Sequence, residues 1–159
     1  MLNSKNEREL AYFVKIDAIE PIIGSDNCEC AVVGGWKVMV RNGTFKAGDL
    51  AIYFEVDSKV DTTKHEFAFL AKRNGKIKTQ KYTFGGKGLM YSQGLLMHTN
   101  DFVDENGRIP AWLGARNIFM ATGGDIFAGD TRFLTKELGV VYADNEDNTR
   151  KASTPDKYK

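Results

Sequence analysis

Short runs of β-branched and aromatic residues, separated by turn-forming residues, follow one another between residues 10 and 97. The runs are LAYFVKIDAIE (10–20), CECAVV (28–33), WKVMVR (36–41), LAIYFEV (50–56), KIKTQKYTF (76–84) and YSQGLLM (91–97). Turns rich in glycine and asparagine, such as Gly34-Gly35, are typical of strands joined by tight connections. The pattern predicts a mainly β fold: a small OB-type β-barrel with one or two short helices and a disordered C-terminal tail.

Hydrophobic spacing distinguishes half-buried strands from fully buried ones. WKVMVR alternates, with Trp36, Val38 and Val40 on one face. This predicts Trp36 as a core anchor, and a base-stacking platform is the alternative. LAIYFEV is almost continuously apolar, which predicts a strand that is buried on both faces.

Two helices are expected. Residues 63–73 carry apolar side chains at helical spacing, and Asn74-Gly75 is a typical helix end. After residue 100 the chain looks looser, and only residues 131–138 predict a second short helix. Asp130 is its expected N-cap and Gly139 its expected C′ residue.

Net charge and cysteine content limit the possible partners. The chain has 22 Lys and Arg against 21 Asp and Glu, a formal net charge of +1. Any polyanion site must therefore come from local clustering rather than from the overall field. Cys28 and Cys30 form a C-x-C motif, but a second ligand pair with zinc-site spacing is missing, so no metal site is expected.

One local charge asymmetry lies between residues 71 and 90. This stretch has six cationic residues and no acidic one, and Tyr82 and Phe84 interleave with the cations. A groove that follows a nucleic-acid backbone requires cations beside aromatic side chains. Strand alternation places Lys76, Lys78 and Gln80 on one face. The alternative is a solvated basic strand without a ligand.

The same stretch contains Lys72-Arg73-Asn74-Gly75, which fits the loose K-x-[DN]-G pattern of enzymes that form a covalent lysyl-nucleotide. Lys76-Ile77-Lys78 looks like the K-x-K pattern that holds nucleotide phosphates in those enzymes. A strand so close to the nucleophile cannot reach the far side of a bound triphosphate. Since a helix end also explains Asn74-Gly75, we expect Lys72 not to be a nucleophile.

Other catalytic motifs are missing from the sequence. It contains no G-x-S-x-G, no H-E-x-x-H and no phosphate-binding loop. Glu55 and Asp57 share a strand face, and we expect a hydrogen-bonded pair at a strand end rather than an acid/base dyad. No catalytic residue is predicted.

The chain is expected to form one domain with polar ends. Residues 1–9 are interpreted as a flexible N-terminus without a signal-peptide core, 10–143 as the OB-like domain and 144–159 as a polar linker or tail. No apolar run approaches the length of a membrane span, so no membrane partner is expected. We predict a soluble, intracellular protein.

Two segments resemble the N-terminal OB domain of a family of ATP-dependent RNA ligases that seal nicks. They are IEPIIGSDNCECAVVGGWKVMVRNGTFKAGDLAIYFEVDS (19–58) and FAFLAKRNGKIKTQKYTFGGKGLMYSQGLL (67–96). They share a GW-x-V-x-V strand, an F-K-x-G-D-L turn, an E-V-D-S strand end, and the I-K-T-x-K and S-Q-G-L-L stretches. The resemblance covers roughly residues 12–98 and continues weakly through Leu138-Gly139-Val140.

The sequence also departs from that family. Lys59 stands where Leu or Ile is usual, a nearby proline is absent, and Tyr82-Thr83-Phe84 replaces a more basic stretch. The family's nucleotidyltransferase domain, whose K-x-D-G lysine takes AMP, is not among these 159 residues, so we expect this chain to be inactive alone. ATP and Mg²⁺ or Mn²⁺ are expected for the parent ligase and no cofactor for this chain.

The resemblance implies that the domain helps to engage duplex RNA at a nick between a 3′-OH and a 5′-phosphate. The implied partners are nicked duplex RNA, or an RNA-containing duplex, and a downstream nucleotidyltransferase domain. A standalone OB module for structured RNA such as tRNA, or a non-catalytic protein-interaction domain, are the alternatives. The predicted nucleic-acid-binding residues are Lys76, Lys78, Lys81, Lys37, Arg41, Gln93 and Lys87.

Overall fold

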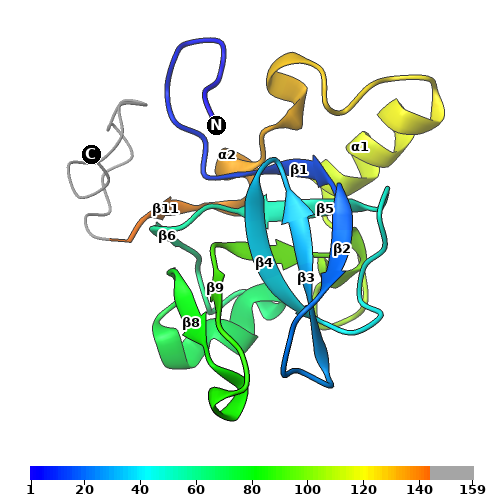
Figure 1. The fold of residues 1–159 in the computed structure, drawn as a ribbon. Helices are drawn as coiled ribbons and strands as arrows, with labels where there is room; N and C mark the ends of the chain where they lie inside the picture. The colour runs from blue at the N-terminus through cyan, green and yellow to red at the C-terminus, as the bar shows by residue number, and fades with distance from the viewer. Residues whose placement is uncertain (144–159) are drawn as a thin grey trace.

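The computed structural model describes residues 1–143, and these residues form a mainly β fold with short helices (Figure 1). The predicted tail, 144–159, lies outside the described residues. The strands are β1 (Ala11–Lys15), β2 (Ala18–Pro21), β3 (Cys28–Val33), β4 (Trp36–Arg41), β5 (Leu50–Phe54), β6 (Ser58–Lys59), β7 (Lys76–Ile77), β8 (Gln80–Tyr82), β9 (Met90–Ser92), β10 (Leu95–Met97) and β11 (Val141–Tyr142). The helices are the 3₁₀ helices η1 (His65–Arg73), η2 (Phe84–Gly86), η3 (Thr99–Asp101) and η4 (Gly129–Arg132), with the α-helices α1 (Ala111–Ala121) and α2 (Thr135–Leu138).

The expected run 10–20 is one chain segment that serves two sheets. Its first half, β1, pairs with β5, and its second half, β2, pairs with β3. The change occurs where the Ile16 N–H donates to the Asp49 carbonyl at 2.9 Å and the Asp17 N–H donates to the Val32 carbonyl at 2.8 Å. Because of this bend, the segment forms an edge strand in two sheets of different orientation, as a small barrel requires.

The barrel is not closed by a continuous ladder among residues 1–143. The sheets are β1-β5-β10, β2-β3-β4, β11-β6-β7 and β8-β9. Between β4 and β9 the Gln93 N–H donates to the Lys37 carbonyl and the Met39 N–H donates to the Ser92 Oγ, both at 2.9 Å. These two bonds stand where a ladder would close the barrel, so the OB fold is present in an open form.

Strand β5 separates two hydrophobic clusters. Ala51 and Tyr53 point into one cluster, which fills the barrel between β1, β3 and β4. Ile52 and Phe54 point into the other, which packs the sheet onto η1, α1 and α2. The predicted burial of β5 on both faces is confirmed, and Ala51, Ile52, Tyr53 and Phe54 are each at most 1% exposed.

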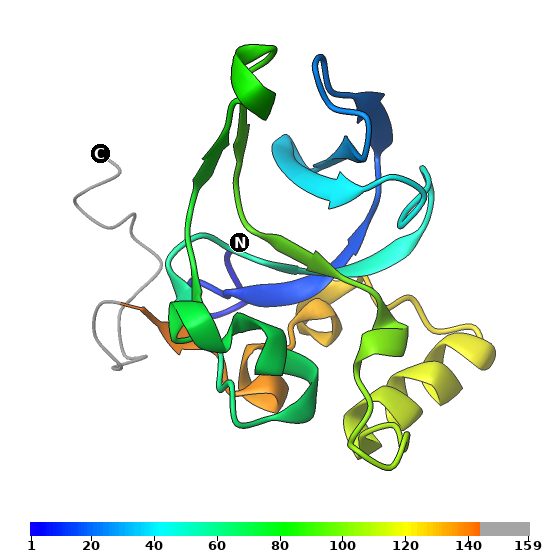
Figure 2. The ribbon, with the colours of Figure 1, turned by 90° about the horizontal axis from the view of Figure 1, so that it is seen from below.

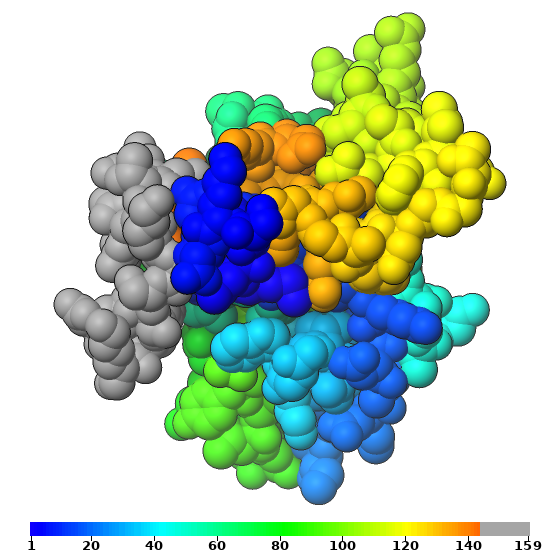
Figure 3. Space-filling view, turned by 90° about the horizontal axis from the view of Figure 1, so that it is seen from above, coloured from blue at the N-terminus to red at the C-terminus, as the bar shows by residue number. Residues whose placement is uncertain are grey.

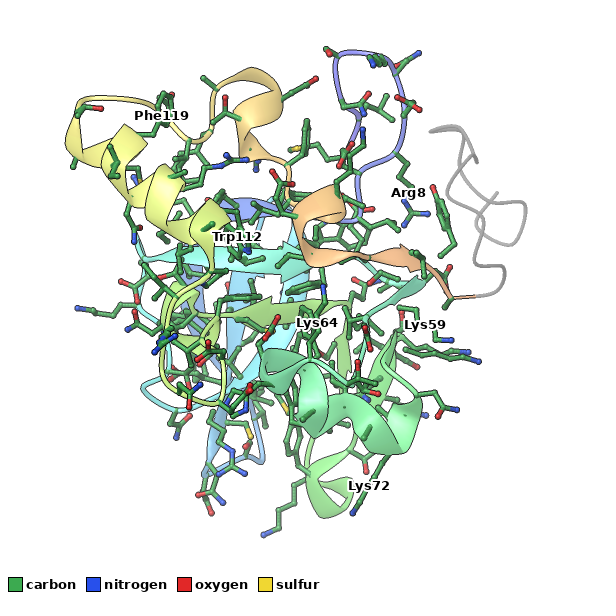
Figure 4. All side chains as sticks on the ribbon, turned by 180° about the vertical axis from the view of Figure 1, so that it is seen from behind. Arg8, Lys59, Lys64, Lys72, Trp112 and Phe119 are labelled. Carbon is green, nitrogen blue, oxygen red and sulfur yellow. The ribbon has the colours of Figure 1, made fainter. Side chains whose placement is uncertain are left out.

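The segment after residue 100, predicted to be loose, contains the longest helix among residues 1–143. Helix α1 begins after Pro110 and places Leu113 in the core, and Trp112 lies between the helix and the sheet (Figure 4). Its periodicity is hard to recognise because Ile118 is 67% exposed and Phe119 39% exposed.

The helix predicted over 131–138 divides into η4 and α2. Gly139 ends α2 in the left-handed conformation, as predicted. Asp130 does not cap a helix, because its carboxylate instead accepts hydrogen bonds from the Ser4 N–H at 2.9 Å and the Ser4 Oγ at 2.5 Å. These bonds lower the pKa of Asp130.

Residues 1–9, interpreted as a flexible N-terminus, lie against the body of the domain, beside the loop that follows α1 (Figure 3). Besides the Ser4 contact, Met1 and Arg8 form ion pairs with Glu55. Arg8 extends from this segment toward β11 (Figure 4), and its guanidinium lies 5.7 Å from the centre of the Tyr142 ring. No helix in the described part of the chain is long and apolar enough to cross a membrane.

Two buried phenols predict a loss of stability at alkaline pH. Burial, and secondarily the Glu55 carboxylate, raises the pKa of Tyr12 and of Tyr53. The unfolded chain ionises these groups near pH 10, whereas the folded protein keeps them protonated, so their stabilisation is complete below about pH 10 and is lost above it. Each phenol contributes a slope of roughly 1.4 kcal/mol per pH unit. Urea unfolding at pH values from about 9 to 11 measures this slope, and Tyr53→Phe is expected to make it shallower. An equal slope in the variant contradicts the assignment.

Candidate nucleic-acid interface

The KRNG sequence is the end of η1. Asn74 adopts the left-handed conformation, with φ 54°, and its N–H donates to the Ala71 carbonyl at 3.0 Å. Gly75 follows with φ 74°, and its N–H donates to the Leu70 carbonyl at 3.0 Å. Lys72 is exposed on the outside of this turn (Figure 4). The predicted helix end is confirmed, and its geometry directs the chain into β7.

Directly after this turn, the chain lines a groove of about 290 Å³. Lys76, Lys78 and Gln80 all line it, and so does Ile77, which strand alternation would place on the other face. Arg73 joins them from the last turn of η1. No Asp or Glu is among the residues that line the groove, so its local charge is positive.

Aromatic side chains accompany these cations. Phe69 of η1 is 61% exposed and lines the groove, as does Tyr82 of β8. The Tyr82 ring stacks on Phe84 with centroids 6.0 Å apart, and its hydroxyl is hydrogen-bonded to the Gln80 side chain. β8 and β9 form an arm that projects from the body of the domain, with η2 at its tip (Figure 2).

A further lysine lies beside the groove residues. The register of β6 and β7 places Lys59 directly opposite Lys76. Lys59 is therefore a neighbour of the groove residues on the adjacent strand.

Three other predicted residues, Lys81, Lys37 and Gln93, lie away from the groove, and the last two line a second hollow. In the β8–β9 register Lys81 lies opposite Tyr91, on the face of the arm away from Gln80 and Tyr82. Lys37, Gln93 and Tyr91 line a hollow of about 580 Å³ on that side. The Lys37 Nζ lies 3.5 Å from the Glu20 Oε1, so an acidic group already accompanies this lysine. Lys37 therefore lies outside the groove that Lys76 and Lys78 line.

Arg41 and Lys87 are also separate from the groove. Arg41 ends β4 opposite Cys28, at the end of the strand farthest from Trp36. Lys87 follows η2 at the tip of the arm, where its backbone and Cβ pack against Gly24. Both side chains are exposed. Thus the structure brings together Lys76 and Lys78 and leaves the other five predicted residues on different surfaces.

The carboxylates near β5 have structural partners. Glu55 is 6% exposed and accepts hydrogen bonds from the Tyr12 hydroxyl at 2.6 Å and from the Arg8 Nε at 2.9 Å. The Met1 ammonium lies 2.5 Å from the Glu55 Oε2, the same oxygen that accepts from Tyr12. Asp57 has φ 74°, and its N–H donates to the Ile77 carbonyl at 2.8 Å. Glu55 therefore acts as a structural anchor rather than as half of an acid/base dyad.

Within residues 1–143, no group of three or more His, Cys, Asp or Glu side chains is arranged to hold a metal ion. Cys28 is half-buried and Cys30 buried, both as free thiols, and burial raises the pKa of Cys30.

Sequence reasoning missed two members of the groove. Phe69 falls outside the buried face of its helix. An aromatic residue in that position could have indicated an exposed binding surface. Arg73 belongs to the basic stretch but was assigned only to the helix end. Trp36, predicted as a core anchor, is 41% exposed. It begins β4 at the rim, whereas Val38 and Val40 point into the barrel.

A family model described as an OB-fold domain matches residues 10–97. The chain belongs to this OB-fold family. The OB domain is also similar to solved structures of the RNA ligase of Naegleria gruberi. A mutant with AMP and Mn is 26% identical, with a TM-score of 0.57, and the match covers 85% of this chain and 35% of that one. A mutant solved without ligand is 26% identical with a TM-score of 0.54, covering 84% of this chain and 34% of that one.

A third structure, the same ligase with PPi, is 24% identical with a TM-score of 0.58 and supports the OB fold alone; it covers 85% of this chain and 35% of the ligase. This OB domain spans about a third of the ligase chains it matches. No curated protein matches the chain.

Proposed function

We propose that this OB domain grips RNA for an ATP-dependent RNA ligase that seals nicks in duplex RNA. The observation that carries the proposal is the groove of Arg73, Lys76 and Lys78, with no carboxylate in its lining and with exposed Phe69 beside it. The similarity to an RNA ligase supports the choice of RNA as ligand. In this proposal a nucleotidyltransferase domain uses ATP and Mg²⁺ or Mn²⁺. The OB domain holds the RNA strand.

The groove is suited to phosphates rather than to base edges. Lys76 and Lys78 are point charges that neutralise phosphates without reading sequence, and Arg73 presents a planar fork that can bind one phosphate through two nitrogens. Each neutralised phosphate releases counterions, so binding is expected to weaken steeply as salt rises. Because phosphate contacts fix register and orientation, such a groove positions a nicked duplex for a partner that performs the chemistry.

The double variant Lys76→Ala/Lys78→Ala tests this role. Loss of two phosphate contacts is expected to weaken binding to nicked duplex RNA and to reduce the slope of log K against log salt by about 1.5–2. Fluorescence anisotropy of a labelled nicked duplex over a series of salt concentrations measures both quantities.

The matched control removes two exposed lysines elsewhere, as Lys5→Ala/Lys46→Ala. It changes the net charge equally and is expected to keep the slope. If both double variants lower the slope by the same amount, binding is non-specific and the groove is not the site. Equal affinity of the unchanged domain for a tRNA fold and for the nicked duplex would favour the standalone RNA-binding alternative.

A further inference from the structure

A second recess, of about 490 Å³, lies beside the β3–β4 turn and shares no lining residue with the groove. Three segments form it: the N-terminal part with β1, the turn that leads to Trp36, and the loop from Phe127 to Arg132. These segments meet on the face of the molecule shown in Figure 3. Its volume is within the usual range for small-molecule sites.

Arg132 is held rigidly at this recess. Its guanidinium carbon lies 5.4 Å from the centre of the Tyr12 ring and 5.8 Å from the centre of the Phe127 ring. Its Nε donates to the Phe13 carbonyl at 2.9 Å. Within residues 1–143 the two terminal nitrogens of Arg132 make no hydrogen bond. A fixed guanidinium with two free donors is prepared to bind a phosphate through both nitrogens.

The other charges in the recess leave it available to an anion. Lys15 is exposed in its lining and forms no ion pair with any described residue. The Glu55 carboxylate is already bonded to Arg8, Tyr12 and the Met1 ammonium. The Asp17 carboxylate accepts the Gly34 N–H at 2.8 Å and stays negatively charged, so beside the paired Glu55 the recess holds this one carboxylate against the two cations Lys15 and Arg132. The cations without a carboxylate partner are therefore Lys15 and Arg132.

Trp36 supplies an aromatic surface at the same recess. It is 41% exposed, although the alternation of β4 would direct it into the barrel with Val38 and Val40. An exposed indole beside a rigid arginine combines a stacking surface for a base with donors for its phosphate.

We propose that this recess binds one unpaired nucleotide of a single-stranded RNA segment, with the base on Trp36 and a phosphate on Arg132 and Lys15. The site is separate from the duplex-binding groove and does not depend on it. It adds a contact for single-stranded RNA to the phosphate contacts already proposed.

Tryptophan fluorescence of the 159-residue chain tests the proposal directly. The chain has two tryptophans, and the second, Trp112, packs against Phe102 in the core. Titration with a 5′-phosphorylated single-stranded RNA tetramer is expected to quench the fluorescence saturably, because a stacked base quenches indole emission. Trp36→Phe, which keeps Trp112, is expected to abolish the quenching. ATP reports whether a free mononucleotide suffices, and ribose 5-phosphate, which has no base, is expected not to quench.

Variants of the two cations complete the test. Arg132→Lys keeps the charge but loses the fork, and is expected to raise the quenching midpoint about tenfold. Lys15→Ala, which leaves the Phe13 contact untouched, is expected to raise it in the same direction, while Lys76→Ala/Lys78→Ala keeps it unchanged. Absence of saturable quenching by both RNA and ATP overturns the proposal, as does quenching that survives in Trp36→Phe or is unaffected by both cation variants. None of these outcomes changes the result expected for the salt dependence of binding at the groove, so the two proposals can fail separately.

Discussion

Gly75→Ala is expected to lower the free energy of unfolding by about 3–5 kcal/mol, because two penalties combine. The residue has φ 74°, where an L side chain is strained, and a Cβ built on it would lie 2.1 Å from the Val60 carbonyl oxygen. Because that oxygen belongs to the backbone, it cannot move away unless the chain between β6 and η1 also moves. Urea unfolding followed by circular dichroism measures the change.

Gly107→Ala is the matched control. Gly107 has nearly the same φ, 78°, but nothing lies within 4 Å of its added Cβ. It is expected to cost only the backbone strain, about 1–2 kcal/mol. If the two substitutions have equal effects, the close packing of the η1–β7 turn against Val60 is contradicted, and with it the rigid placement of Lys76 and Lys78.

Glu55→Ala is expected to destabilise the domain by about 3–5 kcal/mol, since it leaves a largely buried arginine without its partner. The Arg8 side chain is 13% exposed and that of Glu55 8% exposed. The substitution also removes the acceptor of the buried Tyr12 hydroxyl and the ion pair that holds Met1. Chemical denaturation measures the change.

Glu137→Ala serves as the control for this prediction. Glu137 forms an ion pair with Arg116 at 3.4 Å and is the more exposed carboxylate, so its loss is expected to cost about 0–1 kcal/mol. An equally small effect for Glu55→Ala would mean that the Glu55 network contributes little to stability. RNA binding that is lost in Glu55→Ala under conditions where the domain stays folded would show a functional role that the geometry does not predict.

Local chemistry was enough to predict part of this fold. The continuous apolar run of β5 indicated burial on both faces. Successive side chains of a strand point to opposite faces, and in β5 each face packs into one of the two hydrophobic clusters. Asn74-Gly75 indicated a helix end because these residues tolerate positive φ. Lys76 and Lys78 were expected together and do line one groove, although β7 ends at Ile77 and Ile77 lines the same groove.

Features that depend on distant contacts were missed. Helix α1 exposes Ile118, so its sequence has no clear amphipathic period. Trp36 obeys the alternation of its strand but lies at the rim, where the barrel no longer covers it. Lys37 lies on β4 and Lys76 on β7, and the sequence does not show that these two lysines line different hollows. Arg132 had no sequence signal, because Tyr12 and Phe127, whose rings flank it, come from opposite ends of the domain.

Titration of the ¹⁵N-labelled chain with nicked duplex RNA, followed by amide chemical shifts, tests RNA binding at the groove most directly. We expect salt-sensitive shifts that concentrate at Phe69, Arg73 and residues 76–82, and we expect a single strand to add shifts around Trp36 and Arg132. Shifts confined to other surfaces, or no shifts even at low salt, would contradict the proposal that this OB domain grips RNA through its basic groove.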